Sequence, residues 1–205
     1  MPEIGWEDFD VEVEEVSEAD AEKIEKGNEG FLGKCIAVVT KTSPKQLDFK
    51  ASAYRDTAYS CIGILIEYEI EKVLEIGIKQ SSEKPKDALD YVVVYEKASA
   101  NESAQWEGDK IFDEVALFNE AEAEGMAIRR KRIALKLGLI EPGGVIQKKM
   151  WQSDIIGKRV IIKTEENRYT DKNNVPKVGK PRIGRYDGYE KIEDQAAGGE
   201  AWEDI

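Results

Sequence analysis

The sequence predicts a mainly β (α+β) domain: a five-stranded Greek-key barrel with one helix between the third and fourth strands and acidic extensions at both ends. Three observations lead to this prediction. Apolar and β-branched residues gather in short runs, and they alternate with acidic residues most clearly over residues 60–71. Helical spacing of apolar residues is clearest in one stretch, near residues 119–137. The strand-like runs do not alternate with helical patterns, which argues against a parallel α/β sheet.

Charge divides the chain into three parts. The 205 residues suffice for one large domain or one domain with tails, and the net charge of −12 hides strong local differences. Residues 1–30 carry 12 acidic and 2 basic side chains, and residues 193–205 carry 5 acidic side chains and no basic one. The intervening residues 31–192 carry a net charge of +3. We therefore expect an acidic N-terminal arm over 1–30, either solvated or ordered, a folded domain over 31–192 and an acidic flexible tail over 193–205.

Composition argues against several classes of function. The chain has no histidine, which removes the usual general base, the commonest transition-metal ligand and the standard hydrolase triads. We therefore expect no enzyme, no catalytic residue, no metal and no cofactor. Cys35 and Cys61 lie in apolar runs and are expected to be buried free thiols. No apolar run approaches the roughly 20 residues that span a bilayer, so a soluble cytoplasmic protein is expected.

The first two strands are expected at residues 34–41 and 60–71. Gly63, inside the second strand, is a candidate for a bulge or bend. Tyr68 has the same parity as the isoleucines of that strand, so it is expected in the core. The polar segment between these strands contains a small group of basic and aromatic residues: Lys50, Tyr54, Arg55 and Tyr59.

Two further strands are expected at residues 88–97 and 108–117, joined by a polar connection that contains Trp106. The helix follows, with a capping-box spacing at Asn119 and Glu122. One of its faces carries three cations: Arg129, Arg132 and Lys136. These cations form either a ridge that faces phosphate groups or a solvated face that complements the helix dipole, and the second interpretation is favoured.

A long hairpin is expected to close the domain, with strands at residues 159–164 and 182–192 joined by a turn-rich loop. Over residues 168–186, six cations and two tyrosines accompany a single acidic residue, Asp171. Cations interleaved with aromatic rings are what a surface needs to follow a phosphate backbone and to stack bases. These cations and rings are Arg168, Tyr169, Lys172, Lys177, Lys180, Arg182, Arg185 and Tyr186.

This order of elements matches the oligonucleotide-binding (OB) fold, a Greek-key barrel whose ligands lie on strands two and three and between two loops. The basic loop 168–181 falls where the last two strands of that fold are joined. Other mixed α+β arrangements have a similar order and remain open.

Four segments together carry a resemblance to a known family. They are Gly108–Asp113 (GDKIFD), the helix end Leu135–Leu139 (LKLGL), Gly157–Lys163 (GKRVIIK) and the Arg/Tyr-rich final hairpin. In this order they resemble bacteriophage single-stranded-DNA-binding proteins of the OB fold and related small phage proteins encoded near replication and recombination genes. The resemblance implies sequence-independent binding and protection of single-stranded DNA in phage replication or recombination, within the host cytoplasm.

The expected DNA-binding residues combine the two basic and aromatic groups with one tryptophan. They are Lys50, Tyr54, Arg55, Tyr59, Trp106, Arg168, Tyr169, Lys172, Lys177, Lys180, Arg182, Arg185 and Tyr186. Trp151 is a further candidate for base stacking. For each tyrosine, a core or cross-strand position is an alternative of equal weight.

The last residues form a second resemblance. Glu200–Ile205 is similar in kind to the acidic segment that ends single-stranded-DNA-binding proteins, which recruits replication partners and competes with DNA for the basic groove. The residues expected to bind a partner are Trp202, Glu203, Asp204 and Ile205. The tail departs from the family in having few acidic residues and a terminal isoleucine.

Two other functions remain open on the sequence. The −10 charge of residues 1–30 suits an acidic protein-interaction module or a DNA-mimicking inhibitor of a host protein. The second function is that of a nuclease that uses paired carboxylates and a divalent metal. The candidate metal ligands are Asp109, Asp113 and Glu114, but their spacing matches no metal motif.

Overall fold

The computed structural model describes residues 30–49, 58–81, 89–118 and 124–192. The chain divides into two units, Met1–Gly30 and Phe31–Ile205, and every described helix and strand belongs to the second.

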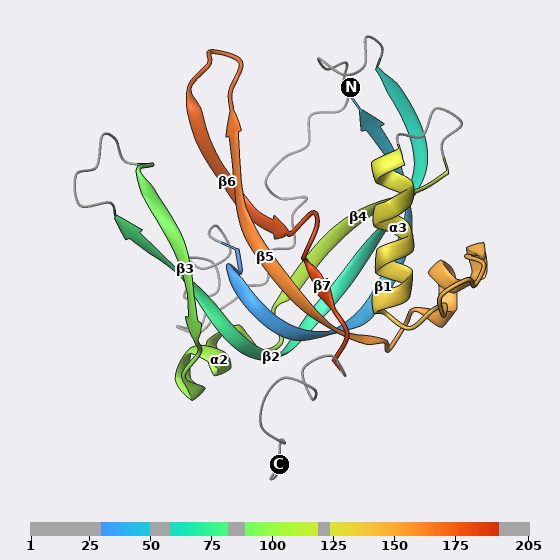
Figure 1. Cartoon of the computed structure of the whole chain (residues 1–205), viewed down its shortest axis with the longest axis horizontal. Coiled ribbons are helices and arrows are strands. Elements are labelled where there is room, and N and C mark those ends of the chain that lie inside the picture. Colours follow the sequence, from blue (N-terminus) through green and yellow to red (C-terminus); the bar gives the residue numbers. More distant parts are fainter. Residues whose placement is uncertain (1–29, 50–57, 82–88, 119–123, 193–205) are drawn as a thin grey trace, which may run out of the picture. The chain divides into compact units, whose positions relative to one another are not determined.

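This second unit is a mainly β structure, as predicted, with seven strands in one antiparallel sheet (Figure 1). The strands are β1 (Gly33–Phe49), β2 (Tyr59–Ser81), β3 (Tyr91–Lys97), β4 (Lys110–Phe118), β5 (Arg159–Thr170), β6 (Pro176–Ile183) and β7 (Tyr189–Glu190). The helical elements are α2 (Ala100–Trp106), α3 (Glu124–Lys136) and a π-helical turn, η2 (Met150–Asp154).

The 23-residue strand β2 organises the sheet. The strand order is β3-β2-β1-β5-β6, with β4 paired to β2 and β7 paired to β5. Along the edge of β2 away from β1, β4 pairs with residues 62–69 and β3 with residues 75–81. In the same manner, β7 and β6 pair with successive segments of β5. Among the described residues no pairing joins β4 to β6 or β7, so the sheet is open.

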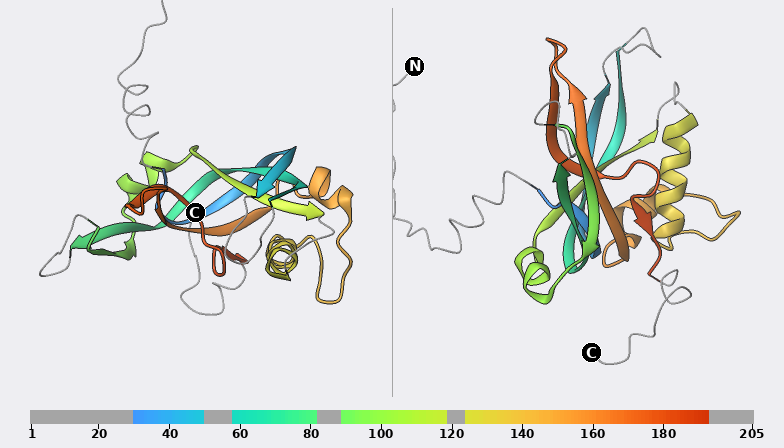
Figure 2. Two further views of the ribbon diagram at one scale, coloured as in Figure 1. Left: turned by 90° about the horizontal axis from the view of Figure 1, so that it is seen from above. Right: turned by 60° about the vertical axis from the view of Figure 1, so that its left-hand side comes forward.

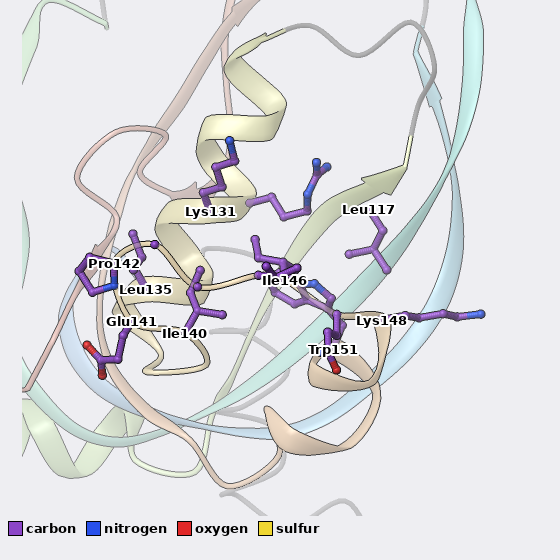
Figure 3. A pocket seen from close by; sticks show the side chains of 14 residues that line it. Leu117, Lys131, Leu135, Ile140, Glu141, Pro142, Ile146, Lys148 and Trp151 are labelled. Atoms are coloured by element: carbon purple, nitrogen blue, oxygen red, sulfur yellow. The ribbon is translucent and has the colours of Figure 1, made fainter.

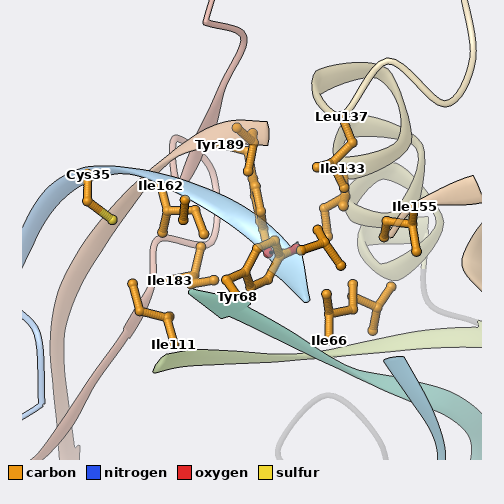
Figure 4. Close-up of a cluster of buried hydrophobic side chains, with 14 of the residues drawn as sticks. Cys35, Ile66, Tyr68, Ile111, Ile133, Leu137, Ile155, Ile162, Ile183 and Tyr189 are labelled. Atoms are coloured by element: carbon orange, nitrogen blue, oxygen red, sulfur yellow. Dashed lines mark hydrogen bonds between the residues drawn. The ribbon is translucent and has the colours of Figure 1, made fainter. Parts of the chain in front are cut away.

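The core lies on the face of β2 that the alternating pattern predicted (Figure 4). Ile64, Ile66, Tyr68 and Ile70 are all buried, which confirms the prediction for Tyr68. Ile62 has the same parity but is 65% exposed. The reason is a register shift between Ile62 and Gly63 in the pairing with β4, at the glycine expected to mark a bulge.

The predicted helix corresponds to α3, and its capping-box residues lie outside the described part of the chain. Gly138 ends it with φ +63°, and the amide of Leu139 donates to the carbonyl of Ala134. Helix α2 was not predicted, although Ser99 and Glu102 form a complete capping box at its start. It interrupts the edge of β2 between β3 and β4.

The closing hairpin differs from the prediction in where its loop begins and ends. Strand β5 continues to Thr170 and β6 begins at Pro176, so most of the predicted loop 168–181 is strand. The predicted second strand, 182–192, is divided between the end of β6 and the short β7. Within the described residues, no helix is long and apolar enough to cross a membrane.

Candidate nucleic-acid interface

The predicted basic hairpin forms a two-stranded arm, residues 164–183, which we call the β5–β6 arm (Figures 1 and 2). Its tip is fixed by Asp171, whose Oδ1 accepts hydrogen bonds from the amides of Asn173 (2.8 Å) and Val175 (3.0 Å). Asn174 has φ +60°, the left-handed conformation that Asn tolerates better than most residues. The turn therefore presents Lys172, which is exposed, at the end of the arm.

One face of the arm carries an accessible aromatic ring beside a cation. Tyr169 pairs directly with Lys177 across the two strands, so both side chains leave the same face. The ring is 50% exposed. It lies against Gly179, where an added Cβ would be 3.3 Å from the Tyr169 Cε1 atom. The missing side chain at Gly179 leaves room for the ring to rest on the backbone.

Arg168, on the opposite face, attaches the arm to β3. Its Nε donates to Glu166 (2.9 Å), and its terminal nitrogens donate to the carbonyls of Leu89 (3.2 Å) and Tyr91 (3.0 Å). The guanidinium carbon also lies 4.6 Å from the centre of the Tyr91 ring. Arg168 was predicted to bind phosphate, but its donors are already engaged within the domain.

Glu166 completes this attachment, and its side chain is only 7% exposed. The Tyr91 hydroxyl donates to Glu166 at 2.6 Å, and Lys79 lies 3.5 Å away. Burial alone would raise the pKa of Glu166, but the hydrogen bonds from Tyr91 and Arg168 outweigh it and hold the pKa below its usual value. We call Arg168, Glu166 and Tyr91 the arm clasp.

The clasp shows how far the sheet curls. Strands β3 and β5 are separated by β2 and β1 in the sheet order, yet their side chains meet. A second contact, from the Tyr95 hydroxyl to the Thr164 carbonyl (2.8 Å), joins the same two strands. A cavity of about 580 Å³ lies where the β5–β6 arm meets the residues just before β3. Its lining residues are Leu89, Asp90, Arg168, Tyr169, Thr170, Pro176 and Lys177.

Three predicted cations of the hairpin remain. Lys180 lies on β6, where it is exposed. Arg182, on the arm, donates to Glu165 at 3.1 Å, and both side chains are substantially exposed. Arg185 and Tyr186 lie beyond the arm in the turn between β6 and β7, where the Arg185 guanidinium lies 5.8 Å from the Tyr186 ring centre. Tyr186 is 73% exposed, which makes it the most accessible ring of the predicted set among the described side chains.

Of the two predicted tryptophans, Trp151 belongs to the core and the partly buried Trp106 packs against it. Trp106 ends α2 and packs edge-on against Phe31, with ring centres 5.5 Å apart. Trp151 is 1% exposed and cannot stack on a base without unfolding its surroundings. Tyr59 is the first residue of β2 and pairs with Phe49. The other predicted residues lie outside the described part of the chain: Lys50, Tyr54, Arg55, Trp202, Glu203, Asp204 and Ile205.

The cations predicted on one face of α3 do not form one shared surface, because Arg129 and Arg132 contact different parts of the domain. Nη2 of Arg129 donates to both carboxylate oxygens of Asp113 at 2.7 Å, and the Tyr189 hydroxyl donates to the same carboxylate at 2.5 Å. The Tyr68 and Tyr189 hydroxyls are 3.1 Å apart (Figure 4). This buried cluster joins α3, β4, β7 and β2, so neither interpretation of the helix face holds for Arg129. Arg132 instead donates to the backbone carbonyl of Arg185 at 3.2 Å.

The buried cluster was not predicted, although the sequence contains a signal for it. Asp113 has the same strand parity as Ile111 and Val115, which places its carboxylate on the core face. Burial raises the pKa of Asp113, and Arg129 and Tyr189 oppose that shift by stabilising the carboxylate. Burial likewise raises the pKa of Tyr189 well above its usual value, so its hydroxyl stays protonated as a donor.

Two of the three carboxylates considered for metal binding have other partners. Asp113 is held by Arg129, and Glu114 pairs with Lys45. No group of three or more Cys, Asp or Glu side chains suited to a metal ion occurs among the residues that the structure describes.

Comparison of the chain with protein-family models gave no match, and comparison with curated proteins gave none either.

Proposed function

We propose that this protein binds single-stranded DNA without sequence preference and protects it during phage replication or recombination. The observation that carries the proposal is the β5–β6 arm, which combines lysines at its tip with an accessible tyrosine on a curled antiparallel sheet. Stacking of bases on aromatic rings and neutralisation of phosphates by lysines are the two interactions that such binding requires.

The strand order supports a relation to the OB fold. β3 and β4 can be treated as one interrupted strand along β2, and β6 and β7 as one interrupted strand along β5. The unit then has five strands, with α3 between the third and the fourth, as in a five-stranded OB barrel. In that fold the loop between the last two strands contacts the nucleic acid, and here it is the tip of the β5–β6 arm.

The side-chain contacts divide the predicted residues into two roles. Lys172, Lys177 and Arg185 have no carboxylate partner among the described residues, so we assign phosphate contacts to them. Of the predicted rings that the structure describes, Tyr169 and Tyr186 are exposed enough to stack on bases. Arg168 holds the arm in place for these contacts through the clasp.

Titration of the full-length protein with fluorescent oligo-dT at several salt concentrations tests the proposal. We expect binding that weakens steeply with salt, because phosphate neutralisation releases counterions. A salt-independent affinity would contradict the assigned phosphate contacts. Absence of binding at low salt would overturn the function and favour the alternative, an acidic interaction module or DNA-mimicking inhibitor that acts through residues 1–30.

A further inference from the structure

A cavity of about 530 Å³ lies on the far side of α3 from its contact with β7, between α3 and the segment that follows it (Figure 3). Its apolar wall includes Leu117, Leu135, Ile140 and Ile146, which come from β4, α3 and the following segment. Trp151, from η2, closes the cavity on its buried side. The cavity shares no lining residue with the one beside the β5–β6 arm.

Cations surround this apolar wall. Arg130 and Lys131 reach the cavity from α3, and Lys148 from the segment before η2. Lys131 and Lys148 are exposed, and no carboxylate pairs with either within the described residues. Glu141 is the one acidic residue of the lining, so the site is electropositive overall. An apolar pocket edged by cations suits a ligand that combines an aromatic group with carboxylates.

The wall also contains an unused hydrogen-bond donor. Nε1 of Trp151 is buried and donates to no acceptor among the described residues, and it is the one buried side-chain nitrogen or oxygen of that part of the chain without a partner. Buried donors of this kind are nearly always satisfied in folded proteins. An acceptor that reached this nitrogen would gain a hydrogen bond that the described part of the domain does not supply.

We propose that this cavity binds the C-terminal segment of the same chain, with Trp202 in the apolar part and neighbouring carboxylates on Lys131 and Lys148. Residues 193–205 carry 5 acidic side chains, no basic one, and Trp202 as their one aromatic residue. This composition complements the cavity in both charge and apolar character. The proposal goes beyond DNA binding and does not depend on it.

The position of β7 makes this contact reachable. The hydroxyl of Tyr189, in β7, binds the carboxylate that also holds Arg129 of α3, so the chain leaves the described domain beside α3. The ten residues from Ile192 to Trp202 can extend roughly 33 Å. A helix with its side chains is roughly 10–12 Å in diameter, so the segment can pass around α3. A short tether also gives an effective concentration of order millimolar, so a weak intrinsic affinity suffices.

The test uses full-length protein labelled with 5-fluorotryptophan and ¹⁹F NMR. The chain has 4 tryptophans, and Trp202→Phe and Trp6→Phe variants assign two of the signals. We expect the Trp202 signal to lie away from its position in the isolated peptide 193–205 and to show a reduced solvent isotope shift. Val145→Glu should return it to the free-peptide position, because Val145 lines the cavity and places a carboxylate there.

Matched variants control for folding and for general charge effects. Val145 is 74% exposed and Val92, on β3, is 64% exposed, so Val92→Glu makes the same change on another surface and should leave the Trp202 signal in place. The Lys131→Glu/Lys148→Glu double variant should also release Trp202, whereas Lys97→Glu should not.

Three outcomes would overturn the proposal. The first is a Trp202 signal at the free-peptide position in the unmodified protein, or one that Val145→Glu does not move. The second is a signal that changes on dilution, which would make the occupant the tail of a second copy. The third is movement of the Trp6 signal instead, which would make the occupant the N-terminal arm. Since no DNA is present, failure of DNA binding leaves this test unaffected.

Discussion

Two clusters of the same chemical composition, each an arginine, a carboxylate and a tyrosine hydroxyl, hold the curled sheet together. In the buried cluster, Arg129 and Tyr189 bind Asp113. In the arm clasp, Arg168 and Tyr91 bind Glu166. The arginine side chain is 23% exposed in the first and 45% exposed in the second.

The arginine and the groups that remain after its removal make the difference between the two clusters. Removing Arg129 leaves the buried Asp113 carboxylate without its counter-charge. Removing the more exposed Arg168 still leaves Glu166, itself 7% exposed, with Lys79 at 3.5 Å and the Tyr91 hydroxyl at 2.6 Å. The buried cluster therefore governs stability, and the arm clasp governs the position of an accessible surface. The same three groups can serve the core or the surface, and burial decides which.

The largest expected effect comes from the buried cluster. Arg129→Met should lower the free energy of unfolding by about 3–5 kcal/mol, because Asp113 then remains buried without its counter-charge. Arg168→Met, the matched change in the arm clasp, should cost less than about 1 kcal/mol. Urea denaturation of both variants measures the difference. Equal losses would mean that exposure does not distinguish the clusters.

The arm should dominate DNA affinity. The Lys172→Gln/Lys177→Gln double variant removes two of the cations assigned to phosphate contacts. It should reduce the magnitude of the slope of log K against log salt by about 1.4, and it should weaken oligo-dT binding about 25-fold at 0.1 M salt. The control makes the same charge change away from both proposed sites, with Lys97→Gln/Lys149→Gln, two exposed lysines. If both pairs lower the slope alike, binding follows net charge and not the arm.

A smaller effect is expected from the aromatic ring of the arm. Tyr169→Leu should weaken oligo-dT binding by about 1 kcal/mol, at the low end of the range for base stacking because half of the ring is already covered. Phe112, on β4, is 52% exposed, close to the 50% of Tyr169, so Phe112→Leu is the matched control. Comparable losses in the two variants would exclude a specific role for Tyr169.

The smallest effect concerns pH and the arm clasp. Because the folded-state pKa of Glu166 lies below its ordinary value of 4.5, the clasp contributes stability above that value and loses it as pH falls through the lower, folded pKa. The protection factors of amides at the base of the arm, which correct for the intrinsic pH dependence of exchange, should fall over that interval by less than about 1 kcal/mol in opening free energy. Glu166→Gln should abolish the dependence, and a persisting dependence would assign the titration to another group.

The sequence by itself determined the β-rich class, the inward face of β2 with Tyr68, the bulge at Gly63 and the C-terminal end of α3. Each of these follows from short-range rules: the alternation of side chains along a strand, the tendency of a glycine inside a strand to mark a bulge, and the left-handed glycine that ends a helix. The missed helix α2 belongs with them, since Ser99 and Glu102 announce it locally.

The tertiary structure alone decided which cations are accessible. From the sequence alone, Arg129 and Arg168 are both candidates for contacting phosphate. Trp106 likewise cannot be distinguished from an exposed ring that stacks on bases. Their roles depend on residues far along the chain: Asp113 for Arg129, Leu89 and Tyr91 for Arg168, Phe31 for Trp106. The partner of a charged or aromatic side chain is chosen by the path of the folded backbone, and the sequence pattern around that side chain does not encode this path.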